Sequence, residues 1–164
     1  MNTDSIEKKI LLKAPQSRVW RALADSREFG TWFGVQFDAP FAPGAQMRGV
    51  IRPSVIQADV AKVQKEYEGK IIELTIEHLE PERLFSFRWH PHAVDSTADY
   101  SSEPTTLVVF SLEPTPGGVL LTVTESGFDQ IPLARRVIAF TSNNNGWGLM
   151  IKSIEEYVMN AQRH

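Results

Sequence analysis

The sequence predicts an α+β fold in which a curved antiparallel sheet packs against a long C-terminal helix. Two observations in the middle of the chain indicate the sheet. Apolar and polar residues alternate in several runs, and turn residues lie between the two runs of each pair. A third observation indicates the helix, because the apolar residues after Pro132 recur at helical spacing for about 25 residues.

Length and composition indicate one globular domain over residues 1–164. The chain has 42% hydrophobic and 23% charged residues and no repetitive tract. Its net charge of -3 disfavours a nucleic-acid partner, which requires a basic face. It contains no cysteine, which excludes thiolate nucleophiles, disulfides and cysteine-based zinc sites.

The N-terminus gives an expectation for location. The segment MNTDSIEKKI lacks the apolar core of a signal peptide, and no stretch reaches the roughly 18 apolar residues of a membrane-spanning helix. We therefore expect a cytoplasmic protein with no membrane partner.

The first third of the chain should hold one strand, two short helices and two further short strands. Alternation predicts a strand over Ile6–Leu12, and Ala14-Pro15 ends it. Ser17 is a candidate N-cap for a helix that reaches about Asp25. The remaining predicted elements are a helix over Ser26–Phe33 that ends at Gly34, and strands over Val35–Phe37 and Met47–Ile51.

A first hairpin is predicted from Tyr67–Leu79 and Glu82–Trp89, joined by Glu80-Pro81. If Leu79 lies opposite Glu82, one face is apolar and the other carries an opposite-charge pair. The predicted pairs are Ile72 with Trp89, Leu74 with Phe87, Ile76 with Phe85 and Glu73 with Arg88.

A second hairpin is predicted from Thr105–Glu113 and Gly118–Glu125. Placing Glu113 opposite Gly118 again gives one apolar face, with Val108 opposite Val123, Phe110 opposite Leu121 and Leu112 opposite Val119. Residues His90–Pro104, between the two hairpins, are polar, small and rich in turn formers, which predicts a long surface loop.

The C-terminal helix should present one apolar stripe to the sheet, formed by Val137, Phe140, Trp147, Ile151, Ile154 and Val158. Its weakest segment is Asn143-Asn144-Asn145-Gly146, where poor helix formers cluster. Asn144 falls on the stripe, and burying its amide costs about 1 to 3 kcal/mol unless it is hydrogen-bonded.

Several short motifs, taken in order, resemble one family. They are Ala14-Pro15 with Val19-Trp20 and Leu23, Trp32-Phe33, the Glu80-Pro81-Glu82-Arg83-Leu84 turn before Trp89, Glu125-Ser126-Gly127-Phe128, and Gly146-Trp147. Together they resemble the homologues of the activator of Hsp90 ATPase in the START-like superfamily. The resemblance implies a helix-grip fold with a cavity between the sheet and the last helix. It leaves function open, because related domains include co-chaperone modules, lipid or hormone receptors and aromatic-polyketide cyclases.

The aromatic residues predicted to face inward are the candidate binding residues, because apolar pockets with few polar groups are common small-molecule sites. The same rings could equally fill the core, and the resemblance favours the cavity. The candidate ligand-binding residues are Trp32, Phe33, Phe37, Phe85, Phe87, Trp89, Phe110, Leu121, Glu125, Phe140, Asn144, Trp147 and Ile151.

Residues that carry chemistry are sparse. We interpret Glu125 as a hydrogen-bond acceptor that fixes the turn into the last helix, rather than as a catalytic base. The group His90-Pro91-His92, with Asp95 or Asp99, is a weak metal motif because no third ligand stands at a fixed spacing. We interpret Arg135-Arg136 as a solvated face. Neither a nucleophile elbow nor a phosphate-binding loop occurs, so we expect no catalytic set, no metal and no cofactor.

The leading hypothesis is a binding protein for a small hydrophobic molecule, aromatic or lipid-like, with a stress-related role as one setting. One alternative is an interaction protein that stimulates an Hsp90-type chaperone ATPase. Another is a cyclase-like enzyme that acts by shaping a reactive chain in the cavity. A monomer and a homodimer both stay open, because Leu107, Val109 and Leu120 lie on the outer face of the predicted sheet.

Overall fold

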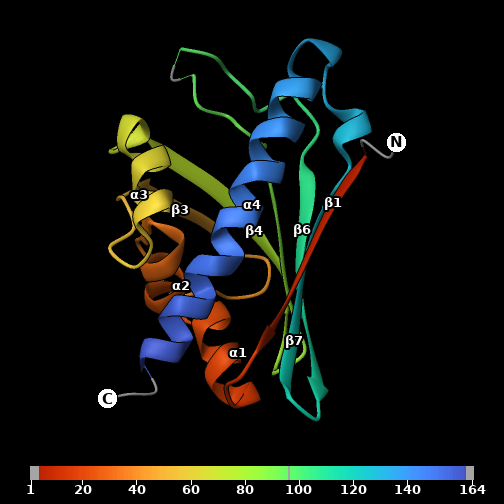
Figure 1. Ribbon diagram of the computed structural model, residues 1–164. Helices are drawn as coiled ribbons and strands as arrows, with labels where there is room; N and C mark the ends of the chain where they lie inside the picture. Colours follow the sequence, from red (N-terminus) through yellow and green to blue (C-terminus); the bar gives the residue numbers. More distant parts are fainter. Residues whose placement is uncertain (1–3, 96, 162–164) are drawn as a thin grey trace.

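The sheet and the long helix α4 (Leu133–Ala161) form the two layers of the fold (Figure 1). The computed structural model of the protein describes residues 4–95 and 97–161. Within this part of the chain, seven strands form one antiparallel sheet in the order β1-β7-β6-β5-β4-β3-β2. The strands are β1 Ser5–Leu12, β2 Val35–Phe37, β3 Gln46–Ile51, β4 Ile71–Glu80, β5 Leu84–Trp89, β6 Thr106–Thr115 and β7 Gly118–Ser126.

The three smaller helices pack against α4. Figure 1 shows α1 (Gln16–Ala24) and α2 (Ser26–Phe33) near the C-terminal end of α4, and α3 (Ala58–Gln64) beside its middle. Two short 3-10 turns, η1 (Lys65–Tyr67) and η2 (Phe128–Gln130), precede β4 and α4. This arrangement confirms the predicted α+β fold with a sheet against a long C-terminal helix. None of the described helices combines the length and apolar composition needed to cross a membrane.

Local sequence signals explain the N-terminal helices. Helix α2 begins after Asp25, whose carboxylate accepts hydrogen bonds from the backbone N–H groups of Arg27 and Glu28. It ends at Gly34, which has the left-handed φ of 82° that favours glycine. The prediction that Ser17 caps α1 is wrong, because α1 begins one residue earlier, after Pro15, without a side-chain cap.

The first hairpin has the predicted inner face but a different register. Leu74 lies opposite Trp89 and Ile76 opposite Phe87, two residues away from the predicted pairs. The turn takes three residues, with Glu82 in the left-handed region at φ 61°, and a bulge follows Ile76. The predicted pair of Glu73 and Arg88 is therefore wrong. Arg88 instead forms an ion pair with Glu77 at 2.7 Å.

The second hairpin also differs by two residues. Phe110 lies opposite Val123 and Leu112 opposite Leu121, because strand β6 continues through Pro114 and the turn contains only Pro116 and Gly117. A shift of two residues leaves every side chain on its predicted face, since the side-chain period of a strand is two. The loop predicted over His90–Pro104 is present between β5 and β6.

Helix α3 is absent from the sequence prediction. Gln57 caps it by accepting hydrogen bonds from the backbone N–H groups of Asp59 and Val60. The following turn η1 includes Tyr67, which was predicted to open a strand, and strand β4 begins only at Ile71.

Aromatic rings fill the interior between α2 and the middle strands. Phe29 of α2 lies at its centre, with ring centroids of seven other aromatic residues between 4.7 and 6.4 Å away. On α4, Trp147, Ile154 and Val158 are buried as predicted. The prediction for Val137 is wrong, because its side chain is 70% exposed and Ala139 is buried instead.

Two helical glycines allow a matched test of this packing. A Cβ on Gly30 of α2 would overlap the backbone carbonyl oxygen of Val35, whereas a Cβ on Gly146 of α4 would meet open space. We expect Gly30→Ala to lower the free energy of unfolding by more than about 2 kcal/mol, because backbone cannot easily yield. Gly146→Ala should raise it by about 0.5 to 1 kcal/mol through helix propensity. Urea unfolding measures both, and equal effects would contradict the packing of α2 against β2.

Candidate ligand-binding site

Glu125, near the end of β7, is fully buried and accepts hydrogen bonds from four side chains. Trp147 Nε1 and Asn143 Nδ2, both on α4, donate to its Oε1 at 2.8 and 2.9 Å. Trp89 Nε1 on β5 and Thr106 Oγ1 on β6 donate to its Oε2 at 2.8 and 2.6 Å. Indole and amide N–H groups can only donate, so Glu125 is the acceptor of this cluster. It joins three neighbouring strands to the last helix.

Glu125 is a hydrogen-bond acceptor, as the sequence interpretation had it, but the segment that it contacts differs from the one expected. It holds the middle of α4 through Asn143 and Trp147 instead of the turn before the helix. None of the ion pairs among the described residues includes Glu125. Neutral donors therefore compensate for the burial of the carboxylate, as a buried charged group requires.

Three aromatic rings pack beside this cluster. Phe33, Trp89 and Trp147 form a triangle in which the centroid separations are 5.8, 6.0 and 6.1 Å. Glu125 holds two of these rings by their indole N–H groups. The orientation of both indoles is therefore fixed by hydrogen bonds as well as by packing.

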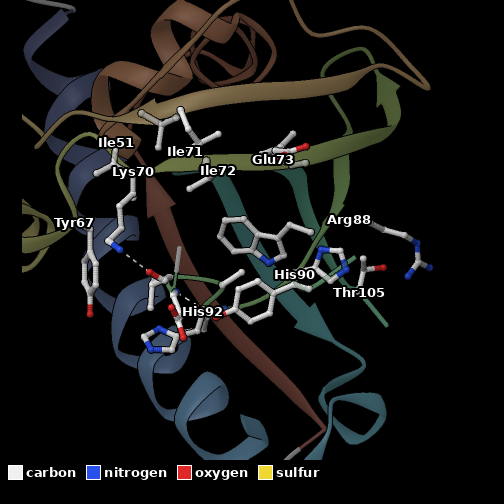
Figure 2. Close-up of a pocket in the computed structure, with 18 of the residues that line it drawn as sticks. Ile51, Tyr67, Lys70, Ile71, Ile72, Glu73, Arg88, His90, His92 and Thr105 are labelled. Carbon is white, nitrogen blue, oxygen red and sulfur yellow. Dashed lines mark hydrogen bonds between the residues drawn. The ribbon is translucent and has the colours of Figure 1, made fainter. Parts of the chain in front are cut away.

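A half-open pocket of about 960 Å³ lies beside this triangle of rings. Phe33, Trp89, Met150 of α4 and Ile72 of β4 supply apolar wall, and Asn143 lies in the wall beside them. Figure 2 shows Ile71 and Ile72 of β4 on one side of the pocket and His90 and His92 on the other. The pocket thus lies between strand β4, the loop after β5 and the middle of α4.

The rim of the pocket carries charged and polar side chains. Lys70 reaches across it and donates a hydrogen bond to the backbone oxygen of Val94 at 2.6 Å (Figure 2). Glu73, Arg88 and Asp95 also line the pocket. The site therefore combines an apolar inner wall with a rim of mixed charge.

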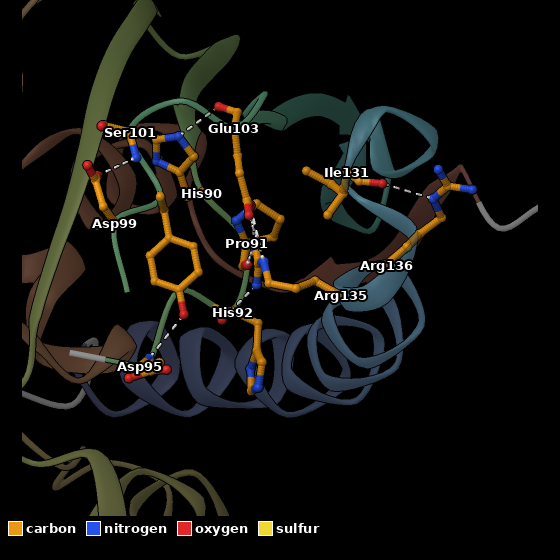
Figure 3. Close-up of polar contacts among 11 residues, drawn as sticks. His90, Pro91, His92, Asp95, Asp99, Ser101, Glu103, Ile131, Arg135 and Arg136 are labelled. Carbon is orange, nitrogen blue, oxygen red and sulfur yellow. Dashed lines mark hydrogen bonds and ion pairs between the residues drawn. The ribbon is translucent and has the colours of Figure 1, made fainter. Parts of the chain in front are cut away.

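Arg135, in the first turn of α4, anchors the loop that forms one wall (Figure 3). Its guanidinium pairs with Glu103 at 2.8 Å and donates to the backbone oxygens of Pro91 and His92, each at 3.2 Å. It also lies over the ring of Tyr100, 4.6 Å from the centroid. The interpretation of Arg135 as part of a solvated face is therefore wrong, because its partners come from a loop distant in sequence.

The two histidines of this loop have different roles. His90 Nε2 lies 3.0 Å from the backbone oxygen of Glu103, and since a carbonyl can only accept, Nε2 is the donor. Burial first, and the nearby guanidinium of Arg135 second, lower the pKa of His92. Among the described residues, no group of three or more histidine, aspartate or glutamate side chains is placed to hold a metal ion.

The structure brings only two of the sequence candidates, Phe33 and Trp89, into the pocket wall. Glu125 and Trp147 stand directly behind this wall. The other candidates pack elsewhere, because the rings of α2 and the sheet fill the space in which a central cavity was expected. These are Trp32, Phe37, Phe85, Phe87, Phe110 and Leu121 in or against the core, Phe140 beside Phe128, and Ile151 on α4.

The polar residue of α4 that faces the site is Asn143, one position before the predicted Asn144. Asn144 is half-buried and is not part of the pocket wall. Both residues lie within one turn of Trp147, so helical spacing alone could not choose between them. The structure distinguishes Asn143 from Asn144 because Asn143 bonds Glu125, which lies on strand β7 and not on α4.

The Glu125 cluster predicts a large loss of stability when its acceptor is removed. Glu125→Leu would leave two indole N–H groups and a hydroxyl without a partner, and each costs about 1 to 3 kcal/mol when buried. We expect the free energy of unfolding to fall by at least about 3 kcal/mol. Glu113→Leu, at an exposed position of the neighbouring strand, is the control. A similar, small loss in both variants, measured by urea unfolding, would contradict the cluster.

The proximity of Arg135 and His92 predicts a titration. The folded-state pKa of His92 lies below its unfolded value, so its contribution to stability is lost as the pH falls below about 6.5. In an NMR titration we expect a His92 midpoint below that value. Arg135→Gln should raise the midpoint part of the way, because burial remains the larger cause. Arg136→Gln, whose side chain bonds Ile131 and Asp129 instead, should leave it unchanged. Equal midpoints in both variants would exclude the effect of Arg135.

Comparison with known proteins agrees with this architecture. A solved protein of Nitrosomonas europaea superimposes with a TM-score of 0.71 at 19% identity, covering 100% of this chain and 99% of that one. A protein of Mesorhizobium loti gives a TM-score of 0.69 at 20% identity, with 95% and 97% covered. A protein of Arthrobacter aurescens gives 0.73 at 15% identity, with 98% and 90% covered. At these identities the likeness shows the fold alone.

A search of curated proteins gives no match. The family model of the activator of Hsp90 ATPase homolog 1-like proteins, however, matches residues 13–159, which is most of the 164-residue chain and includes the Glu125 cluster and the pocket wall. The chain therefore belongs to the family of activator of Hsp90 ATPase homolog 1-like proteins, as its motifs predicted.

Proposed function

We propose that the protein binds a small molecule with a flat, largely aromatic body and at least one polar group, in the pocket between β4, the loop after β5 and α4. The observation that carries the proposal is the pocket of about 960 Å³ with an apolar wall backed by the Glu125 cluster. Pockets for drug-sized ligands have volumes of about 300 to 1,000 Å³ and a mainly apolar lining with a few fixed polar groups.

The wall favours an aromatic body. Trp89 and Phe33 offer ring surfaces whose positions are already fixed by Trp147 and Glu125, so a ligand ring would order little protein when it binds. Stacking of a ring on such a surface adds roughly 0.5 to 1.5 kcal/mol to the gain from burial.

The rim favours a ligand that is not purely apolar. Lys70, Glu73, Arg88 and Asp95 line the pocket, and a fully hydrocarbon ligand would strip water from these groups without replacing it. The ligand is therefore expected to be more polar than the sequence alone suggested. One end should be a ring or short apolar chain, and the other should reach the rim.

A thermal-shift panel of aromatic alcohols, flavonoids and fatty acids tests the proposal. A ligand at about 100 times its Kd should stabilise the protein by about 2.7 kcal/mol, or roughly 5 to 10 °C in Tm for a chain of this size. Ile72→Trp, which places a larger side chain in the pocket wall, should abolish the shift. Ile138→Trp, on the exposed side of α4, should preserve it.

Three results would count against the proposal. A panel that leaves the Tm unchanged would contradict it, and capture of a chaperone in the same preparation would then favour the interaction alternative. Equal loss in the two tryptophan variants would place any binding outside the pocket. Turnover of a bound compound would instead favour the cyclase-like alternative.

A further inference from the structure

The amide of Asn143 has a fixed orientation. Its Nδ2 lies 2.9 and 3.2 Å from the two carboxylate oxygens of Glu125. Those oxygens also accept from the indoles of Trp89 and Trp147, which can only donate. The NH₂ branch of the amide must therefore face Glu125, since the carbonyl branch would place two acceptors in contact.

The carbonyl branch of Asn143 is consequently left for another partner. No hydrogen bond from any described residue reaches Oδ1, and Oδ1 is not among the buried side-chain atoms that lack a partner. Asn143 is half-buried and lies in the pocket wall beside Trp89. The indole N–H of Trp89 is already used by Glu125, so this ring offers its surface and not its donor. At this point of the wall the protein presents an aromatic surface next to a free acceptor.

We infer that Asn143 Oδ1 selects ligands that carry a hydrogen-bond donor, in particular a hydroxyl on a flat aromatic ring that lies against Trp89. The inference rests on the proposed function and names the ligand class of the same pocket. A phenolic hydroxyl would donate to Oδ1, and the bond would repay the loss of water from both groups. A methyl ether of the same ring has no donor, so it would leave Oδ1 without a partner.

A matched pair of probes tests the inference: 2-naphthol and 2-methoxynaphthalene, whose affinities are measured by calorimetry. We expect the natural protein to bind 2-naphthol about five- to tenfold more tightly, the range of one neutral hydrogen bond. Asn143→Leu should reduce this ratio to about one, mainly by weakening 2-naphthol. Asn144→Leu, the next residue on the same helix and outside the pocket wall, should keep the natural ratio.

The outcomes separate this inference from the proposed function. Equal binding of the two probes to the natural protein would overturn the inference and leave the proposed function standing. An unchanged ratio in Asn143→Leu would also overturn the inference, because the preference would then come from another group. Failure of both probes to bind would overturn the inference, while the proposed function would still be decided by the thermal-shift panel. If Asn143→Leu does not fold, the side-chain amide resonances of Asn143 in the ¹⁵N-labelled natural protein decide: 2-naphthol should shift them more than 2-methoxynaphthalene does, and equal shifts would overturn the inference.

Discussion

The buried carboxylate of Glu125 is the constraint on which the positions of the other parts depend. It satisfies two indole N–H groups, an amide and a hydroxyl that come from β5, β6 and α4. The carboxylate and its donors satisfy one another in the interior. Removal of the carboxylate or of a donor would therefore leave buried polar groups without partners. Because these donors stand on three separate elements, all of them can be satisfied only at one placement of α4 on the sheet. That placement also decides which face of α4 lines the pocket.

One part of the interior is closely packed, and another part opens into a pocket. Rings of α2 and the central strands fill the space around Phe29, where every gap would cost stability. Beyond the triangle of Phe33, Trp89 and Trp147, the interior opens into a pocket closed on one side by a loop. Arg135 fixes this loop with one ion pair and two backbone hydrogen bonds. The packed region therefore supports the walls of the pocket.

Periodicity and turn residues were enough to predict the fold, because they depend on local sequence. The predicted inward residues of both hairpins were correct, since a register shift of two residues preserves the face. The predicted alternation fails only past the bulge in β4, where Leu79 lies opposite the buried Phe85. The register depended on the left-handed turn at Glu82 and on the continuation of strand β6 through Pro114. The local sequence predicts neither feature. The site was harder to predict. Alternation in the sequence shows which side chains point inward, but not which of them are in contact. The sequence therefore cannot distinguish a ring packed in the core from a ring in a pocket wall. The choice of Asn143 over Asn144 required knowing where Glu125 lies in space.

Chemical-shift mapping by NMR tests the central claim most directly, that Glu125 holds Trp89 and Asn143 as one wall of a binding pocket. In protein labelled with ¹⁵N, the indole resonance of Trp89 and the side-chain amide resonances of Asn143 report on this wall. Saturation with 2-naphthol should move these signals most, while the indole of Trp32, which bonds the backbone oxygen of Ala22 in the core, should hardly change. Shifts confined to the exposed start of α4, around Leu133 and Val137, with Trp89 and Asn143 unmoved, would contradict the account.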